Sequence, residues 1–484
     1  MNKWGSYGLS VVLVMGMAGA GCVGPIDARA VREANRIDDL ARARQVAPMP
    51  QETLDLDTAI DYALKHNLQL WMARQQKAIE MELQTGATLK MLPDLRLNIE
   101  DSRRNKFHAS KSVNVFTGRE SLTTSYSAEK SRNTVDLTMA WNLLDFGVTY
   151  LRVTQQAGRV VIAEQQRRRL QQRVVMEVTT AYWQAVAARQ LAEEAERIRT
   201  RLNEQITGIR NQLKQNNLGE SAALEAELPL LRQRHRMATY RRTYDVALQE
   251  LGRLMGVPVG ARFEPVRPES MELPADQLTG DMEKLEELAT LNRPELYQDD
   301  MRSHIATQEA RIALIEMFPA PSVFWRYSHD ENTYLWAHDW QTVGITTAWD
   351  VLSLPQKIYG RQARLKEVDL ARKRRVATTL AVLTQVHIAA IEYDMAVRQL
   401  KDVKQIESKS SRLLETGRKA AADGKSHGGR TLSLELQHLA DLDVYLQSYV
   451  QTMGARARLI NSVGVEPAAA LSMTGSATDE EVSE

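Results

Sequence analysis

The 484-residue chain contains a single cysteine, Cys22. One thiol cannot form a disulfide within the chain, nor can it supply the clustered thiolates of a structural zinc site. The net charge is also close to zero, because 62 Lys and Arg balance 61 Asp and Glu. This composition argues against a nucleic-acid-binding protein, which needs a strongly basic surface.

Catalytic signatures are missing as well. The histidines form no HxxxH or HExxH spacing, and the chain has no GxxxxGK[ST] phosphate-binding loop. The 18 methionines are scattered, so we expect them to pack in the core rather than to carry a metal ion. The sequence therefore predicts no enzyme, no cofactor and no metal site.

After residue 22, the chain has no run of about 18 apolar residues, so no further transmembrane helix is expected. The N-terminus itself reads as a targeting segment, in which Lys3 precedes an apolar stretch at 9–17 and small residues lead to Cys22. This context resembles a bacterial lipobox, although Gly19 stands where Leu is usual. We expect residues 1–22 to be a lipoprotein signal peptide and Cys22 to be lipidated. The alternative is an ordinary signal peptide with an incidental cysteine.

The chain repeats itself. Residues 63–70 resemble 289–296, and the Met-Leu-Pro of 91–93 matches 317–319; both pairs are displaced by 226 residues. Residues 138–142 then match 346–350, and the Gly-Val of 256–257 matches 464–465, both with a displacement of 208. The displacement changes once, so the first repeat is longer by 226 − 208 = 18 residues between Pro93 and Trp141. Two registers that each hold across separate matches indicate a tandem duplication.

Each repeat predicts a helix, two strands, a very long helix and a returning helix. The first helix, at about 56–91, ends at Pro93. Strands are predicted by alternation of apolar and polar residues at 95–100, 134–143, 323–327 and 343–350. The stretches from about 148 to 215 and from 356 to 423 contain no proline, and as helices each would span roughly 100 Å. Such rods cannot be buried in a globular domain, so they must form coiled coils or project from the strands. The returning helices, at about 221–254 and 431–462, are half as long.

Four strands with one apolar and one polar face suit lipid on one side and water on the other. Four strands cannot close a barrel, and an open edge in lipid leaves backbone groups without partners. Three copies would supply twelve strands, enough for an open bore. Tryptophans in or beside these strands, above all Trp141, Trp325 and Trp349, are expected at the membrane interface.

The doubled order of these elements, the Met-Leu-Pro entry at 91–93 and the Trp-Asn-Leu-Leu-Asp-Phe-Gly of 141–147 resemble the outer-membrane efflux protein (TolC) family. The resemblance covers about residues 50–467. It implies a mainly α protein with transmembrane β-strands: a homotrimer whose twelve-stranded barrel continues into a periplasmic tunnel of helices. It also implies a periplasmic adaptor protein and an inner-membrane pump, of the RND or ABC type, as partners.

In that family the helical turnarounds form the periplasmic entrance and meet the adaptor. The matching tips here are 216–221, with Leu218, Gly219 and Ser221, and 424–431, with Gly428 and Gly429. Family carboxylates that ring the closed pore fall on Glu225 and, if Gly429 is aligned, on Glu435. If Gly428 is aligned instead, Arg430 fits the family's latch arginine and the acidic positions become Leu434 and Gln437. A ring of three carboxylates repels itself and attracts cations, so such residues are candidate gate residues.

These observations divide the chain into the signal peptide, an N-terminal periplasmic segment (23–55), repeat 1 (56–258), a linker (259–284), repeat 2 (285–467) and a disordered acidic tail (468–484). The predicted function is a passive, lipid-anchored duct of the bacterial outer membrane that exports small molecules such as drugs or metal ions. Two alternatives stay open: the exit duct of a type I protein secretion system, and a periplasmic coiled-coil scaffold lipoprotein without a pore.

Overall fold

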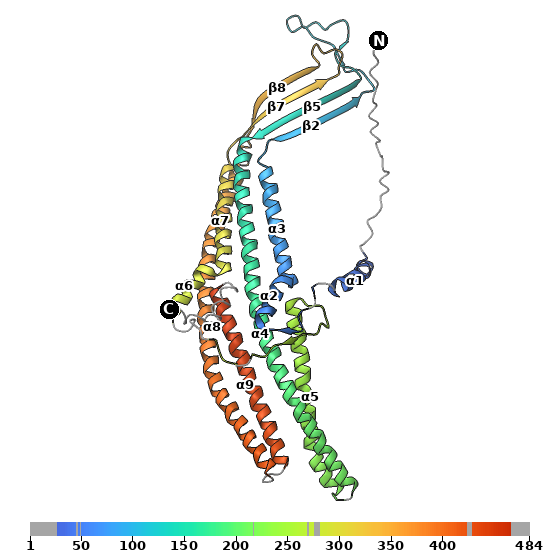
Figure 1. The fold of residues 1–484 in the computed structure, drawn as a ribbon. Coiled ribbons are helices and arrows are strands. Elements are labelled where there is room, and N and C mark those ends of the chain that lie inside the picture. The colour runs from blue at the N-terminus through green and yellow to red at the C-terminus, as the bar shows by residue number, and fades with distance from the viewer. Residues whose placement is uncertain are drawn as a thin grey trace, which may run out of the picture.

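The computed structural model describes residues 27–44, 47–48, 50–215, 217–268, 271–274, 281–423 and 428–465. Cys22 and the predicted tail 468–484 lie outside these residues. The described chain forms a long rod with a β-sheet at one end and two helical hairpins at the other (Figure 1). Such a shape leaves much of the surface of each element free for contact with other chains.

The sheet contains the four strands predicted from the alternation of apolar and polar residues. They are β2 (Asp94–Arg103), β5 (Ser131–Asn142), β7 (Ala320–Asp330) and β8 (Asp339–Ala348), all antiparallel, in the order β2-β5-β7-β8. The connection from β2 to β5 spans residues 104–130, whereas β7 and β8 are joined by 331–338 alone. The longer connection contains a small hairpin of β3 (Ala109–Ser110) and β4 (Ser125–Tyr126), so the extra residues of repeat 1 lie beyond the sheet.

Two very long helices run away from the sheet, as predicted. α4 (Leu143–Lys214) has 72 residues and α8 (Leu354–Ala422) has 69, which correspond to lengths of just over 100 Å. α4 begins where the side chain of Asn142 accepts hydrogen bonds from the backbone N–H groups of Leu144 and Asp145. Each long helix pairs with a returning helix of 36 residues, α5 (Glu220–Met255) or α9 (Gly428–Val463). Pro229 lies inside α5 without ending it.

The first helix of each repeat differs from the prediction, because it is two helices rather than one. α2 (Leu56–His66) ends at Asn67, and α3 (Leu68–Leu89) begins there. The side-chain oxygen of Asn67 accepts from the N–H groups of Gln69 and Leu70, and its Nδ2 donates to the carbonyl oxygen of Leu254 at 2.8 Å. Capping and this tie to α5 together favour the break. The second repeat breaks in the same way between α6 (Met282–Asn292) and α7 (Pro294–Ile315).

The half-length helices pack along the long ones. α3 and α5 both contact α4, while α7 and α9 both lie against α4 and α8 (Figure 1). In the half nearer the sheet the helices therefore follow the order α3-α4-α7-α8, which repeats the order of the strands. One edge of this layer is α3 and the other is α8.

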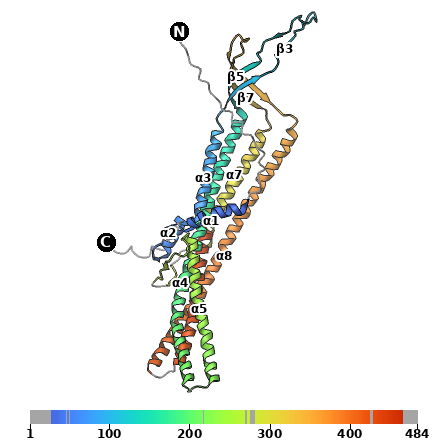
Figure 2. The ribbon, with the colours of Figure 1, turned by 90° about the vertical axis from the view of Figure 1, so that its right-hand side faces the viewer.

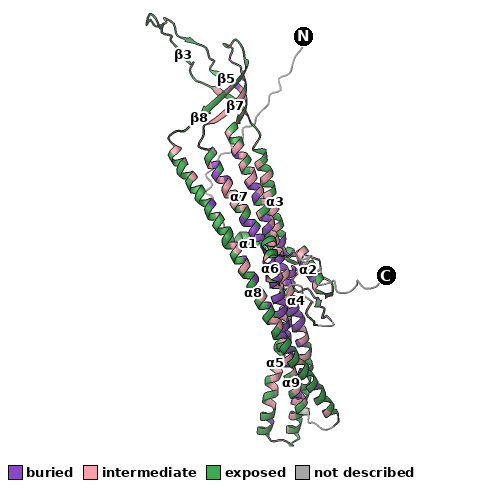
Figure 3. Cartoon of the chain, turned by 90° about the vertical axis from the view of Figure 1, so that its left-hand side faces the viewer, coloured by how far each residue is buried: buried purple, intermediate pink, exposed green. Residues whose placement is uncertain are grey.

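At the middle of the rod, α2 and α6 form a small collar, with α1 (Ala28–Arg44) nearby (Figure 2 and Figure 3). β1 (Thr53–Leu54) pairs in parallel with β6 (Glu264–Pro265), so part of the predicted linker is structured. Buried side chains concentrate at this level (Figure 3). Tyr182 and Trp183 of α4 and Tyr449 of α9 form its aromatic centre.

Candidate channel-forming surfaces

The four-stranded sheet has one apolar and one polar face. Residues paired across neighbouring strands share a face, so Leu95, Met139, Trp325 and Val343 form one row. Leu97, Leu137 and Tyr327 form the next row on the same face. The opposite face carries rows such as Arg96, Thr138, Arg326 and Thr342. Leu95, Leu97, Val343 and Ile345 are all exposed in the single chain, so this apolar face has no cover within the protomer.

The sheet also has two open edges. Within the described residues, β2 pairs only with β5, and β8 pairs only with β7. Each outer edge therefore presents backbone N–H and C=O groups without a strand partner, a template for pairing with another chain.

The three tryptophans predicted at the membrane interface lie in or directly after the strands. Trp141 is exposed and packs edge-on against Phe146, at the end of the sheet that meets the helices. Trp349 lies at the same end, and its Nε1 donates to the carbonyl oxygen of Met317 at 3.2 Å. Trp325 lies farther along β7, where its Nε1 donates to Gln341 Oε1 at 3.2 Å. Anchored rings of this kind combine an apolar body with a polar atom, which is what an interface position requires.

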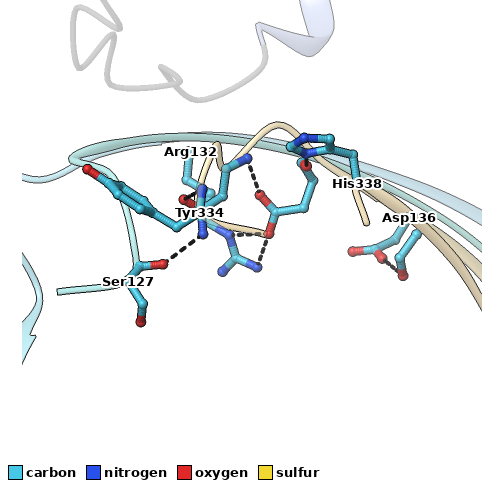
Figure 4. Close-up of polar contacts among 8 residues, drawn as sticks. Ser127, Arg132, Asp136, Tyr334 and His338 are labelled. Carbon is cyan, nitrogen blue, oxygen red and sulfur yellow. Dashed lines mark hydrogen bonds and ion pairs between the residues drawn. The ribbon is translucent and has the colours of Figure 1, made fainter. Parts of the chain in front are cut away.

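At the end of the sheet far from the helices, a buried carboxylate connects the two loops between the strands through hydrogen bonds (Figure 4). Asp330 Oδ2 accepts two hydrogen bonds from Arg132, at 3.0 and 2.8 Å, and its Oδ1 accepts from the N–H of Asn332 at 3.0 Å. Asn332 in turn donates to the carbonyl oxygen of Ser127 at 2.9 Å. Asp330 thus ties the long connection of repeat 1 to the short one of repeat 2.

The edge helices carry exposed apolar stripes. On α8 the stripe consists of residues at helical spacing: Val376, Leu380, Ile388, Ile391 and Met395. It falls in a segment long and apolar enough, by length and composition, to cross a membrane; within the described chain α8 alone meets that criterion. On α3, at the other edge, Leu68, Met72, Ile79 and Leu83 are exposed on one face.

The first helical tip joins α4 to α5. Gly219 is the N-cap of α5 with extended backbone, and Leu218 precedes it. Ser221 and Glu225 are exposed on the first turns of α5, where the Ser221 hydroxyl lies 3.5 Å from the Glu225 carboxylate. Of the second tip, residues 424–427 lie outside the described chain. α9 begins at Gly428, and Gly429 and Arg430 are exposed in its first turn.

Glu435, the other candidate gate residue, is buried inside the protomer with 1 % of its surface exposed. Its Oε1 accepts hydrogen bonds from Nε and Nη2 of Arg418 on α8, at 3.2 and 3.0 Å. Arg201 of α4 forms an ion pair with the same oxygen. Glu435 therefore links α9 to both long helices. In the alternative register, Leu434 packs beside Gly417 and Gln437 is exposed.

Sequence analysis did not identify Arg201 and Arg418 as partners of Glu435. Both arginines lie in helices rich in charge, where nothing in the sequence distinguishes them from solvated residues. Among the residues that the structure describes, no group of three His, Cys, Asp or Glu side chains is arranged to hold a metal ion.

Comparison with known proteins identifies the fold. No protein-family model and no curated protein sequence matches the chain. Solved structures do match. The Campylobacter jejuni CmeC outer-membrane channel superimposes with a TM-score of 0.69 at 12 % identity, over 87 % of this chain and 89 % of that one.

Two further channels agree. The outer-membrane channel OprN gives a TM-score of 0.66 at 16 % identity, over 84 % of this chain and 89 % of OprN. The open state of the Neisseria gonorrhoeae MtrE outer-membrane channel gives 0.62 at 15 % identity, over 84 % and 88 %. The mainly helical fold with two tandem repeats predicted from the sequence is thereby confirmed: the chain has the fold of the TolC-like outer-membrane channels.

Proposed function

We propose that the protein is the outer-membrane component of a tripartite export system, a passive trimeric duct for small molecules. The observation that carries this proposal is the four-stranded sheet with an exposed apolar face and two open edges. In lipid, such a sheet is stable only when other copies complete the ring. Three copies supply twelve strands, and β8 of each would pair with β2 of the next.

The helical layer supports the same assembly. Its edges, α3 and α8, lie beneath the two edge strands and carry the exposed apolar stripes described above. In the proposed ring, α8 of one protomer packs against α3 of the next, and these stripes become buried. The apolar stripe of α8 is then a contact between protomers rather than a membrane span.

The proposal also assigns roles to the N-terminal cysteine and to the helical tips. Cys22 anchors the chain in the outer membrane through its acyl chains, with contributions of about 0.8 kcal/mol from each buried CH₂. The tips at Leu218, Gly219, Ser221, Gly428 and Gly429 form the periplasmic entrance and contact an adaptor protein, with Glu225, Arg430 and Glu435 as candidate gate residues. An inner-membrane pump of the RND or ABC type supplies the energy.

Planar-bilayer recording tests the duct. Detergent-purified protein should migrate as a trimer and produce discrete conductance steps after insertion. A monomer that stays in water without detergent and forms no pore would refute the proposal. The anchor is tested separately: Cys22→Ser should abolish acylation detected by mass spectrometry and leave the protein's helical content unchanged.

A further inference from the structure

A cavity of about 720 Å³ lies where the end of α9 meets the start of α7, between α4 and α8. Five arginines from α4, the start of α7 and α9 line it, together with two glutamates. The arginines are Arg169, Arg173, Arg293, Arg302 and Arg458, and the glutamates are Glu295 and Glu392. The lining therefore has an excess of three positive charges.

The acidic groups nearby are already shared. One oxygen of Glu295 accepts from both Arg169 Nε, at 3.1 Å, and Arg293 Nη2, at 3.0 Å. Glu392 pairs with Arg458 at 3.1 Å, whereas Arg173 Nε lies 3.9 Å from Glu177 Oε1. The guanidinium groups of this cavity thus have more donor capacity than these carboxylates use.

Two side chains of the lining are more than nine-tenths buried and keep a donor without a partner. Arg293 is 6 % exposed and Gln298 is 4 % exposed; neither Arg293 Nε nor Gln298 Nε2 has a hydrogen-bond partner. The other nitrogens of Arg293 are engaged, since Nη1 donates to the carbonyl oxygen of Asn461 and Nη2 to Gln385 Oε1. Burial lowers the pKa of the Arg293 guanidinium from its ordinary value.

The amino end of α7 adds to the positive electrostatic potential of the cavity. Arg293 is the N-cap of α7, and its side chain makes no capping hydrogen bond. The first turns of the helix, at Glu295, Gln298 and Arg302, line the cavity. The free N–H groups and positive dipole of a helix start favour an anion at this position. Glu295 offsets part of this positive potential, and its Oε2 is an acceptor buried without a partner.

We propose that this cavity binds a small molecule that carries a carboxylate or phosphate group. Arginine forks match the geometry of both oxyanions through paired N–H···O bonds. A bound oxyanion would accept from Arg169 and Arg173 at the mouth of the cavity. Small rearrangement around it would bring the buried donors of Arg293 and Gln298 within reach.

The position of the cavity gives the site a consequence that rests on the proposed function. A smaller cavity shares Gln172, Met176 and Asn461 with it, and opens on the face that carries α2 and residue Pro274. The large cavity contains no residue of α2. In the proposed ring, with α2 on the outside, we place the three oxyanion sites towards the bore at mid-height.

Binding is tested on the detergent-solubilised full-length protein by isothermal titration with sodium phosphate and, separately, with citrate, at fixed ionic strength. Saturable binding is expected. The double variant Arg169→Gln/Arg173→Gln removes two charged donors at the mouth of the cavity and should weaken binding by tenfold or more. Both side chains are exposed, so the fold should be retained. Gln298→Leu, which removes a buried donor and no charge, should also weaken binding.

The matched control is Arg197→Gln/Arg199→Gln, which removes two exposed arginines from the same helix about 40 Å away. It should bind like the unmodified protein. Equal binding by all variants, or heat that grows linearly without saturation, would show only nonspecific attraction of anions and would overturn the proposal. Because this titration needs no membrane, a failure here is distinguishable from the absence of a conducting pore.

Discussion

Gly256 lies directly against His66: a Cβ at Gly256 would come within 2.6 Å of the carbonyl oxygen of His66. Gly256 ends α5 with a φ of +78°, and Gly464 ends α9 with +79°. A Cβ at Gly464 would lie 3.0 Å from the carbonyl carbon of Asn292. Both repeats therefore bring the end of a returning helix onto the break between two shorter helices. Both positions therefore require glycine, because the positive φ and the close approach leave no room for a Cβ.

Replacement of Gly256 by alanine should be strongly destabilising. The left-handed conformation costs a non-glycine residue about 1 kcal/mol, and the clash with the His66 backbone adds to it, so a loss of about 2–4 kcal/mol is expected. Gly260 is the matched control, because its φ is +84° but a Cβ there would meet nothing within 4 Å. Gly260→Ala should lose only the conformational contribution, about 1 kcal/mol of the free energy of unfolding. Thermal unfolding followed by circular dichroism measures both; equal losses would contradict the close approach.

Neighbouring residues of β2 allow the two faces of the sheet to be compared. Leu97 belongs to the apolar face, and Asn98, paired with Asp136, belongs to the polar face. Leu97→Arg should cost about 2–4 kcal/mol if that face meets the centre of the bilayer. Asn98→Arg places the same charge beside a carboxylate on the opposite face and should be tolerated. The amount of trimer in outer-membrane fractions reports the difference, and similar losses in both variants would mean that the apolar face does not meet lipid.

The strands and long helices were predictable because their signals are local. Alternation gives the face of each strand residue, and a long stretch without proline permits one continuous helix. The break at Asn67 was missed because it depends on a contact with Leu254, 187 positions away. The cavity arginines were missed for a related reason: Arg293 looks like any charged residue until α7, α8 and α9 are brought together around it. Side chains whose role depends on distant segments cannot be read from periodicity.

Acid should loosen the attachment of α3 to α4. Hydrogen bonds from Arg167, together with Lys77 of α3, lower the pKa of Glu164 to about 2 from an ordinary value of 4.5, although burial opposes them. A carboxyl group with a lowered pKa stabilises the fold above its ordinary value, and this contribution is lost as the pH falls from about 4.5 towards 2. Glu164→Gln should therefore reduce the drop in melting temperature over that range. An unchanged acid dependence in this variant would show that the ion pairs of Glu164 contribute little.

Glu435 and Glu225 are both candidate gate carboxylates, but their surroundings predict different behaviour. Glu435 is buried between Arg201 and Arg418, whereas Glu225 is exposed, 3.5 Å from Ser221. Glu435→Gln removes the charge that links α9 to both long helices and leaves two half-exposed arginines to hydrate. We expect a stability loss of about 1–3 kcal/mol and a larger single-channel conductance, because the α8–α9 hairpin is freer to move from α4. Glu225→Gln should change the melting temperature little, because an exposed carboxylate contributes little. If Glu435→Gln melts like the unmodified protein and conducts no more, the buried ion pairs do not restrain the α8–α9 hairpin.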